Sequence, residues 1–239
     1  MTPVTFQTPA SHPPTALPES SRGALARDRM LMAALDLFGR HGFEATTTRM
    51  VAQQAGMNLG AIPYYFGSKD DLYGQAAAWL ADYIADRMRE PLAHLQAACD
   101  EETDPTALVD HLVRFMQAHA RSLLADAAPA SWIQFYMRAQ TECDAAFERL
   151  FEQVISPSHD TVCGVLARVM HLPADHPRTR ALAYLAFHQS VCFRLTGDVL
   201  LRRLGWDGFT PPRIEMLLET IGTALRDQLL GAARRGAQA

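Results

Sequence analysis

The chain has 239 residues, of which 49% are hydrophobic and 20% are charged, and its formal net charge is -4. These values are typical of a globular protein with one or two domains, and they exclude a strongly basic nucleic-acid coat. Residues 22–72 hold six basic and five acidic residues, whereas residues 73–239 hold 16 basic and 20 acidic residues. A mildly basic N-terminal part on an acidic body favours local attraction to DNA.

Cysteine usage and hydropathy indicate a cytoplasmic protein. The four cysteines contain no CxxC pair, which favours reduced thiols over a disulfide framework. No apolar run is long enough to cross a bilayer, and the N-terminus lacks the pattern of a secretory signal. We therefore expect no membrane segment, and nothing in the sequence predicts a cofactor.

The N-terminal segment, residues 1–21, is rich in proline, serine and threonine and has few large apolar groups. Such a segment buries too little surface to offset its ordering entropy, so we expect a flexible tail. The first helix is predicted over residues 25–41, because Leu31, Leu35 and Phe38 form an apolar stripe at helical spacing.

Residues 46–73 predict a helix-turn-helix followed by the start of a further helix. Threonines at 46–48 offer hydroxyl caps for a helix to about Ala55, and we expect Asn58 to cap a short second helix. The motif needs a small residue where the helices cross, a glycine in the turn and an apolar residue returning to the core. These positions are occupied by Ala52, Gly56 and Ile62. An ordinary helical hairpin is the alternative.

The further helix begins with a capping pattern, Ser68 followed by Asp71. Asp70 and Asp71 suit the positive end of the helix dipole, whereas Lys69, the only lysine in the chain, does not. Exposed amides beside a lysine form a good phosphate site, so we interpret Lys69 as a phosphate contact. A solvated lysine without a partner is the alternative.

The run LFGRHGFEATTTRMVAQQAGMNLGAIPYYFGSKDDLY, within residues 29–73, resembles the DNA-binding domain of TetR/AcrR-type transcriptional regulators. The C-terminal half of the chain is similar to the ligand domain of CecR-like members. The resemblance implies an all-α fold, with a three-helix helix-turn-helix head over residues 22–73 and a helical-bundle body for ligand binding and dimerisation over residues 74–239. It also implies a homodimer that binds a palindromic double-stranded DNA operator, commonly as a repressor, and is released by a small-molecule effector.

Ten residues of the head are expected to contact DNA. Thr47, Tyr64 and Lys69 suit phosphates, and Arg49 carries a donor fork for guanine. The full set is Thr47, Thr48, Arg49, Asn58, Leu59, Gly60, Ala61, Tyr64, Tyr65 and Lys69. Pro63 departs from the family pattern, in which a non-proline residue is usual. Because proline lacks an amide and biases the preceding residue away from helix, we expect the second helix to begin late or to kink.

The rest of the chain is predicted to be helical, separated by capping and proline signals. We expect the helix after Ser68 to end near Pro91. Further helices are predicted over residues 105–124, from about 129, over 143–170 with an interruption near Pro157, over 175–196 and over 210–232. No segment alternates with period two, so no sheet is expected.

Aromatic and methionine side chains on three of these helices predict a ligand pocket between bundled helices. The predicted lining is Trp79, Tyr83, Phe115, Met116, His119, Trp132, Phe135 and Tyr136. Plain core packing gives the same pattern, so it is the alternative for any single residue.

The last two predicted helices carry wider apolar faces than a monomer needs to cover. Joining them across a two-fold axis in a four-helix bundle would bury these faces in a homodimer. The predicted interface residues are Leu182, Leu185, Val191, Ile214, Leu218, Ile221 and Leu225. Packing of both helices on the body of their own protomer is the alternative.

Other functions have weaker support. His188 and Cys192 are four residues apart and could reach one ion, but two ligands do not make a site, so we predict no metal. No nucleophile elbow, phosphate-binding glycine loop or carboxylate pair indicates an enzyme. Two alternative functions remain: a constitutive DNA-binding protein whose body recruits a protein partner, and a thiol- or metal-responsive sensor.

Overall fold

The computed structural model describes residues 19–125, 128–142 and 145–236. The helices in these ranges are α1 (Glu19–Ala45), α2 (Thr48–Gln54), α3 (Ala61–Phe66), α4 (Lys69–Glu101), α5 (Pro105–Leu124), α6 (Ala130–Glu142), α7 (Ala145–Leu150), the π-helix η1 (Phe151–Ile155), α8 (Ser156–Met170), α9 (Pro177–Leu195), α10 (Gly197–Leu204) and α11 (Pro211–Gly236). No strand occurs in these ranges, and the predicted all-α class is confirmed. None of these helices is long and apolar enough to cross a membrane. The predicted tail lies outside the described residues, except for its last three, which belong to α1.

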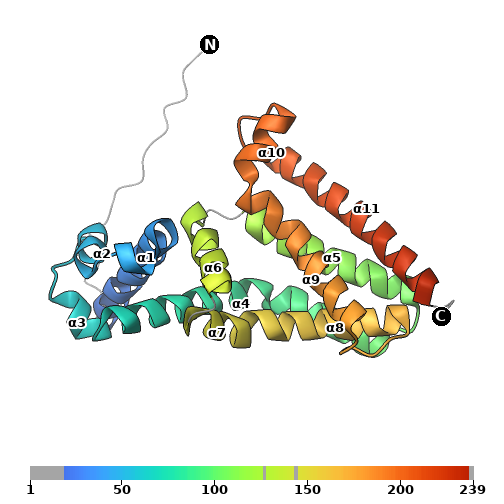
Figure 1. Ribbon diagram of the computed structural model, residues 1–239, viewed down its shortest axis with the longest axis horizontal. Coiled ribbons are helices and arrows are strands. Elements are labelled where there is room, and N and C mark those ends of the chain that lie inside the picture. The colour runs from blue at the N-terminus through green and yellow to red at the C-terminus, as the bar shows by residue number, and fades with distance from the viewer. Residues whose placement is uncertain (1–18, 126–127, 143–144, 237–239) are drawn as a thin grey trace, which may run out of the picture.

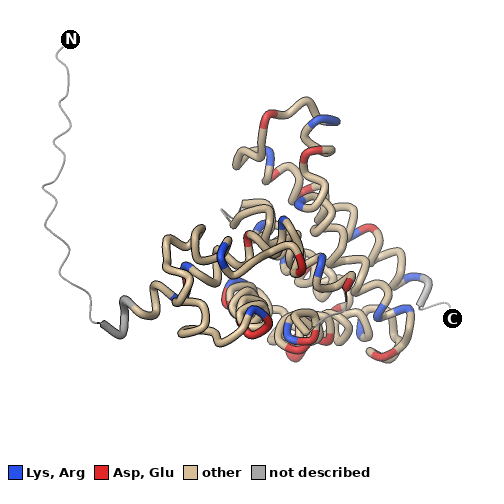
Figure 2. The backbone as a smooth tube through the Cα atoms, turned by 60° about the vertical axis from the view of Figure 1, so that its left-hand side comes forward, with Lys and Arg blue, Asp and Glu red and all other residues tan. Residues whose placement is uncertain are grey.

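The helices form a head and a body that α4 connects (Figure 1). Helices α1, α2 and α3 make the head, and α4 leaves it to run along the base of the body. Helix α6 stands between α1 and the rest of the body, and its contact with α1 is the most extensive between any two described elements. Basic and acidic positions are interspersed over both parts (Figure 2).

The predicted apolar stripe of α1 forms the centre of the head core. Leu31, Leu35 and Phe38 are almost fully buried there. At Gly42 the backbone leaves the helix with φ 79°, a value that favours glycine. The fully buried Thr46 then donates its hydroxyl to the carbonyls of Leu37, at 3.1 Å, and Gly42, at 2.8 Å. This arrangement fixes the direction in which the chain enters α2.

The prediction that the helix after Ser68 ends near Pro91 is wrong, because α4 continues to Glu101. A proline inside a helix removes one hydrogen bond and costs about 3 kcal/mol. Beyond it, Leu95 and Ala98 are buried in the body core, and this burial offsets part of the cost. The helix therefore continues past a local helix-breaking signal into a segment that is buried in the body core.

Two further features of the body differ from expectation. The interruption predicted near Pro157 comes earlier, as the π-helix η1, and Pro157 lies in the first turn of α8. Helix α10 was not predicted. Gly197 is buried close to the ring of Phe209, so tertiary packing accounts for a glycine at this position.

Four residues predicted at a dimer interface lie inside the protomer. These residues are Ile214, Leu218, Ile221 and Leu225, each at most 6% exposed. They belong to two apolar clusters that α11 shares with α5. The amide of Gln117 also donates to the carbonyl of Leu218 at 3.0 Å. Packing on the protomer's own body, the alternative considered above, describes these four residues.

Candidate nucleic-acid interface and ligand cavity

The start of α2 presents two of the predicted DNA contacts. Thr47 is the N-cap, and its hydroxyl accepts a hydrogen bond from the Met50 amide at 3.2 Å. Thr47 and Arg49 are exposed beside this cap. Thr46, in contrast, has its hydroxyl in the core and does not cap the helix.

Helix α3 begins late, at Ala61, with Gly60 as its N-cap. The predicted side-chain cap from Asn58 is wrong; the Ala61 amide donates instead to the Asn58 carbonyl at 3.1 Å. Pro63 consequently occupies the first turn, where an amide has no acceptor within the helix. The missing proline amide therefore costs α3 no hydrogen bond.

The predicted DNA contacts differ in exposure. Tyr64 is 81% exposed and Leu59 is 53% exposed, with the edge of the Tyr64 ring against Tyr65 at 4.9 Å between centroids. Ala61 is 7% exposed and belongs to the head core, so the structure does not place it on this surface. The exposed residues are Thr47, Arg49, Asn58, Leu59, Gly60 and Tyr64, and the half-buried ones are Thr48, Tyr65 and Lys69.

The start of α4 has the predicted cap. The Ser68 hydroxyl accepts from the Asp71 amide at 3.0 Å and donates to the Asp71 carboxylate at 2.6 Å. Lys69 extends from the first turn toward the end of α1. Its ammonium lies 4.2 Å from the centroid of the Phe43 ring and donates to the Glu44 carbonyl at 3.5 Å. These contacts direct the ammonium toward the end of α1.

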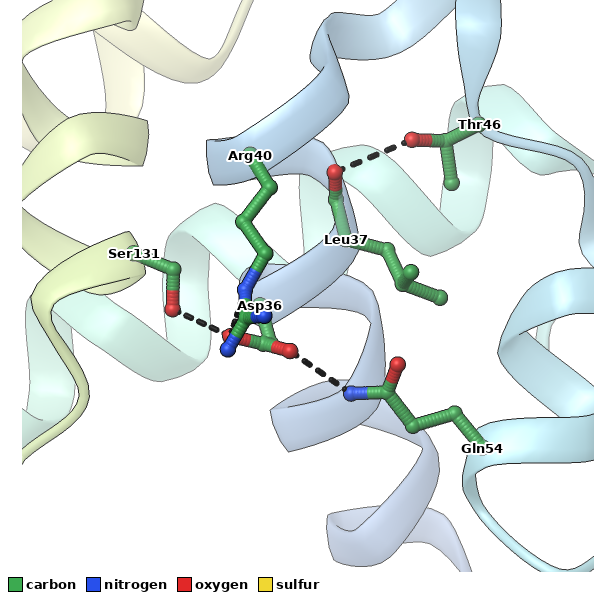
Figure 3. Close-up of polar contacts among 6 residues, drawn as sticks. All are labelled: Asp36, Leu37, Arg40, Thr46, Gln54 and Ser131. Carbon is green, nitrogen blue, oxygen red and sulfur yellow. Dashed lines mark hydrogen bonds and ion pairs between the residues drawn. The ribbon is translucent and has the colours of Figure 1, made fainter.

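A carboxylate of α1 joins the head to α6 (Figure 3). Asp36 accepts hydrogen bonds from the Ser131 hydroxyl on α6 and from the Gln54 amide on α2, the latter at 2.8 Å, and it pairs with Arg40 at 2.9 Å. Burial raises the pKa of Asp36, but the hydrogen bonds from Ser131 and Gln54 and the charge of Arg40 outweigh it and hold the pKa below its ordinary value. One ionised group thus contacts three helices.

Close packing reinforces this junction. A Cβ atom at Gly39 would overlap the backbone carbonyl of Ser131, so only glycine permits α1 and α6 to approach this closely. Phe135 of α6 packs edge-on against Tyr73 at 5.2 Å, and Tyr73 packs edge-on against Phe38 at 5.0 Å. The sequence carried no signal for this junction, because Asp36 and Ser131 are 95 positions apart and belong to no motif.

A cavity of about 690 Å³ lies on the other side of α6. Five of the predicted pocket residues line it: Tyr83, Phe115, His119, Trp132 and Tyr136. Trp79 lies behind this wall, stacked on Tyr83 at 5.7 Å. Met116 and Phe135 are at most 1% exposed and pack in the two main cores, so they do not line the cavity.

Helix α9 contributes a cavity wall that the sequence analysis missed. One stripe of this helix lines the space with Arg180, Tyr184, Phe187, His188, Val191 and Arg194. Their spacing of three and four residues is a detectable signal, but the helix was assigned to dimerisation. Val191 therefore lines the cavity, whereas Leu182 is half-buried beside the body core and Leu185 is 51% exposed.

Two titratable groups of the cavity, His119 and Tyr136, are held uncharged. Burial, with smaller effects from His159 and His188, lowers the pKa of His119 to about 4. Burial and the nearby Tyr184 raise the pKa of Tyr136 to about 12. The Nδ1 atom of His119 and the indole N–H of Trp132 have no hydrogen-bond partner. The cavity therefore combines apolar walls with buried polar atoms whose hydrogen bonds are unmade.

The two residues considered for metal or thiol chemistry are engaged in local contacts. His188 has its Nδ1 atom 2.9 Å from the Tyr184 carbonyl, and the Cys192 thiol donates to the Gln189 carbonyl at 3.0 Å. Burial raises the pKa of Cys192, which is the opposite of an activated thiolate. Within the part of the chain that the structure describes, no three His, Cys, Asp or Glu residues are placed to hold an ion.

Comparisons with known proteins agree with this arrangement. The model of the "Bacterial regulatory proteins, tetR family" matches residues 30–76, and that of the "HTH-type transcriptional dual regulator CecR, C-terminal domain" matches residues 108–232. The chain is 31% identical over 214 residues to the HTH-type transcriptional dual regulator CecR of Shigella flexneri, covering 90% of this chain and 96% of that protein.

Two solved structures are similar in fold. The ketosteroid transcriptional regulator KstR2 of Mycobacterium tuberculosis has a TM-score of 0.58 at 15% identity, over 84% of this chain and 93% of its own. The regulator FadR of Bacillus subtilis, solved with stearoyl-CoA, has a TM-score of 0.53 at 14% identity, over 86% and 98%. At such identities the likeness shows the fold alone. The two family models and the CecR relative together span the head and the body, and the chain belongs to the TetR family of bacterial transcriptional regulators.

Proposed function

We propose that the chain is a homodimeric repressor that leaves a palindromic DNA operator when a small molecule fills the cavity. The observation that carries this proposal is the position of α6. Trp132 and Tyr136 on this helix line the cavity, while Ser131 and Phe135 on the same helix contact the head. A ligand that displaces Trp132 and Tyr136 must therefore also move Ser131 and Phe135, because all four belong to one helix.

We propose that ligand binding is transmitted from the body to the head through α6 and not only through α4, the covalent link. Helix α4 links head and body in the chain, yet α6 has the larger contact with α1. Through Asp36, a shift of Ser131 reaches Gln54 on α2 of the helix-turn-helix. A ligand changes DNA affinity only by its difference in affinity for the two positions of the head, typically about 1–3 kcal/mol.

The operator and its release are tested with the purified full-length protein. DNA fragments are selected for binding, and compounds are then screened for release of the selected operator. We expect a palindromic sequence and at least one compound that weakens binding in wild type but acts less strongly on Ser131→Ala. The proposal would be contradicted if every compound that binds the cavity left the affinity for DNA unchanged.

The DNA surface is proposed to consist of the exposed residues of α2, α3 and the start of α4. Lys69 contacts a phosphate, because it belongs to the first turn of α4, where the helix amides favour an anion. Lys69→Ala should weaken binding to all sequences alike and reduce the salt slope by roughly one. Lys69→Arg is the matched control and should retain the slope. A changed sequence preference with an unchanged slope would show that Lys69 reads bases.

A second copy of the chain is proposed to cover the outer face of α9 and α10. Leu185 and Leu195 on α9 and Val199 on α10 are 51%, 45% and 61% exposed. Burying such a face against its symmetry mate removes apolar surface from water and pairs the two heads. This surface replaces the buried residues of α11 in the proposed interface.

The dimer proposal is tested by sedimentation of the double variant Leu185→Glu, Leu195→Glu. We expect a folded monomer with greatly reduced operator affinity. Leu25→Glu is the control, because Leu25 is 51% exposed on the head and lies outside the proposed interface. A double variant that sediments as a dimer would exclude this surface.

A further inference from the structure

We propose that the cavity binds an organic anion with an apolar, largely aromatic body and one acidic group, such as a carboxylate or a sulfonate. The inference rests on the proposed effector function of the cavity and names the chemical class of its ligand. Three features of the wall support it: its aromatic surface, its unpaired indole N–H donor and its charge.

The aromatic surface selects the body of the ligand. Tyr83 and Trp132 meet edge-on at 5.3 Å on one side. On another, Phe187 stacks on His159 at 4.4 Å and meets His119 edge-on at 5.2 Å. Flat rings in such arrangements offer faces and edges to a further ring. The volume of about 690 Å³ suits a molecule of drug size.

The buried hydrogen-bonding groups favour an acceptor on the ligand. Trp132 is 8% exposed, and its indole N–H, which can only donate, has no partner. His119 is neutral at physiological pH, and its unpartnered Nδ1 atom can donate or accept according to the tautomer. Leaving a buried donor unpaired is costly, and a ligand oxygen that accepts from it removes this cost.

The charged groups of the wall favour a negative ligand. Three arginines line the cavity, Arg87, Arg180 and Arg194, against one carboxylate, Asp160. Among the described residues, neither Arg180 nor Arg194 belongs to a salt bridge, and Arg194 donates only to the Ala128 carbonyl. Burial lowers the pKa values of His119 and His159, so these two histidines add no positive charge at neutral pH. An anion is therefore attracted by the wall, and a cation is repelled.

The test compares two fluorescent probes that share one body and differ in charge. Anilinonaphthalene sulfonate is an anion, and phenylnaphthylamine is the same ring system without the sulfonate. Each is titrated into the full-length protein at low and high salt. We expect the sulfonate to bind at least roughly tenfold more tightly at low salt, and only its affinity to fall with added salt.

Variants locate the effect in the cavity. Arg180→Gln and Arg194→Gln should each weaken sulfonate binding by roughly three- to tenfold and leave binding of the neutral probe unchanged. Glutamine at position 194 keeps a donor for the Ala128 carbonyl. Arg178→Gln is the matched control, because Arg178 precedes Arg180 on α9 but does not line the cavity. It should leave both affinities unchanged.

Two results would overturn the inference. One excludes only the anionic ligand, and the other excludes the proposed effector function as well. If the neutral probe binds as tightly as the sulfonate and the arginine variants have no effect, the cavity binds apolar molecules without regard to charge. The proposed effector function then stands and the anion assignment fails. If neither probe binds, the cavity is not a ligand site, and both fail together.

Discussion

The Ser131 hydroxyl donates to the Asp36 carboxylate, and this single bond connects a helix of the ligand cavity to a helix of the head (Figure 3). The same carboxylate accepts from Gln54 on α2 at 2.8 Å. Three helices from distant parts of the sequence thus meet at one ionised group. The thermodynamic coupling between these side chains can be measured without knowing the effector.

Removal of either partner of this bond should destabilise the fold. Ser131→Ala leaves a half-buried carboxylate with one donor fewer, and Asp36→Asn weakens three contacts, so each should lower the free energy of unfolding by about 1–3 kcal/mol. The double variant should lose less than the sum, by about 0.5–2 kcal/mol, because both changes remove the same bond. Urea denaturation measures the free energy of unfolding of the wild type, the two single variants and the double variant. A control cycle uses Asp110→Asn, which breaks the pair with Arg226 between α5 and α11 and should be additive with Ser131→Ala.

Gly39→Ala should disturb the contact between α1 and α6. The added methyl overlaps the Ser131 carbonyl, so α6 must shift, and we expect a loss of about 1–3 kcal/mol in the free energy of unfolding. The matched control is Gly74→Ala on α4, where the methyl would lie 3.8 Å from Arg149 and alanine favours the helix. Thermal melts that show equal stability for both variants would contradict the close approach at Gly39.

Pro63→Tyr should preserve the fold. Pro63 lies in the first turn of α3, where an amide forms no helical hydrogen bond, so stability should change by less than about 1 kcal/mol. Pro91→Ala tests the opposite environment, because an amide in the interior of α4 gains a hydrogen bond and should raise stability by about 1–3 kcal/mol. Melting curves and operator binding are measured together. Lost operator affinity at unchanged stability would show that Pro63 shapes the DNA surface.

His119 should make stability depend on pH. The pKa falls from 6.5 to about 4 on folding, so between these values the unfolded chain binds more protons than the folded chain. The contribution of neutral His119 to the free energy of unfolding is complete above about pH 6.5 and is lost as the pH falls toward 4. His119→Phe should therefore flatten the profile by roughly 1–3 kcal/mol, a range that allows for solvent inside the cavity. Urea unfolding between pH 5 and 7.5 measures the slope, and an unchanged slope would show that His119 is hydrated in the folded protein.

Local signals were sufficient to predict the order of the helices in the head, but not the start of α3, where the predicted Asn58 cap is wrong. The Thr47 cap, the turn at Gly56 and the Ser68 cap depend on neighbouring residues only, and the structure contains all three. Leu31 and Phe38 were identified as core because one amphipathic helix has one buried face. Such features are encoded within a few turns of the chain, so one sequence reveals them.

The body was harder to predict because several of its helices are covered on more than one side. Leu218 and Leu225 formed a wide apolar face, but periodicity does not say whether a face meets its own body or a partner. Glutamate at these two positions would therefore unfold the protomer instead of separating a dimer. Val191 was likewise assigned to an interface, although it lines the cavity. Spacing identifies a buried stripe, and only the fold identifies its neighbour.

The two-sided position of α6 has a consequence for redesigning the specificity of this regulator. A substitution at Trp132 or Tyr136 alters the fit of the ligand and also the seating of Ser131 and Phe135, so an altered response would have two inseparable origins. Tyr184 on α9 lines the same space, and the observed contacts with the head come from other helices. Libraries that diversify the α9 wall would therefore change which compound is sensed while the output of the switch stays intact.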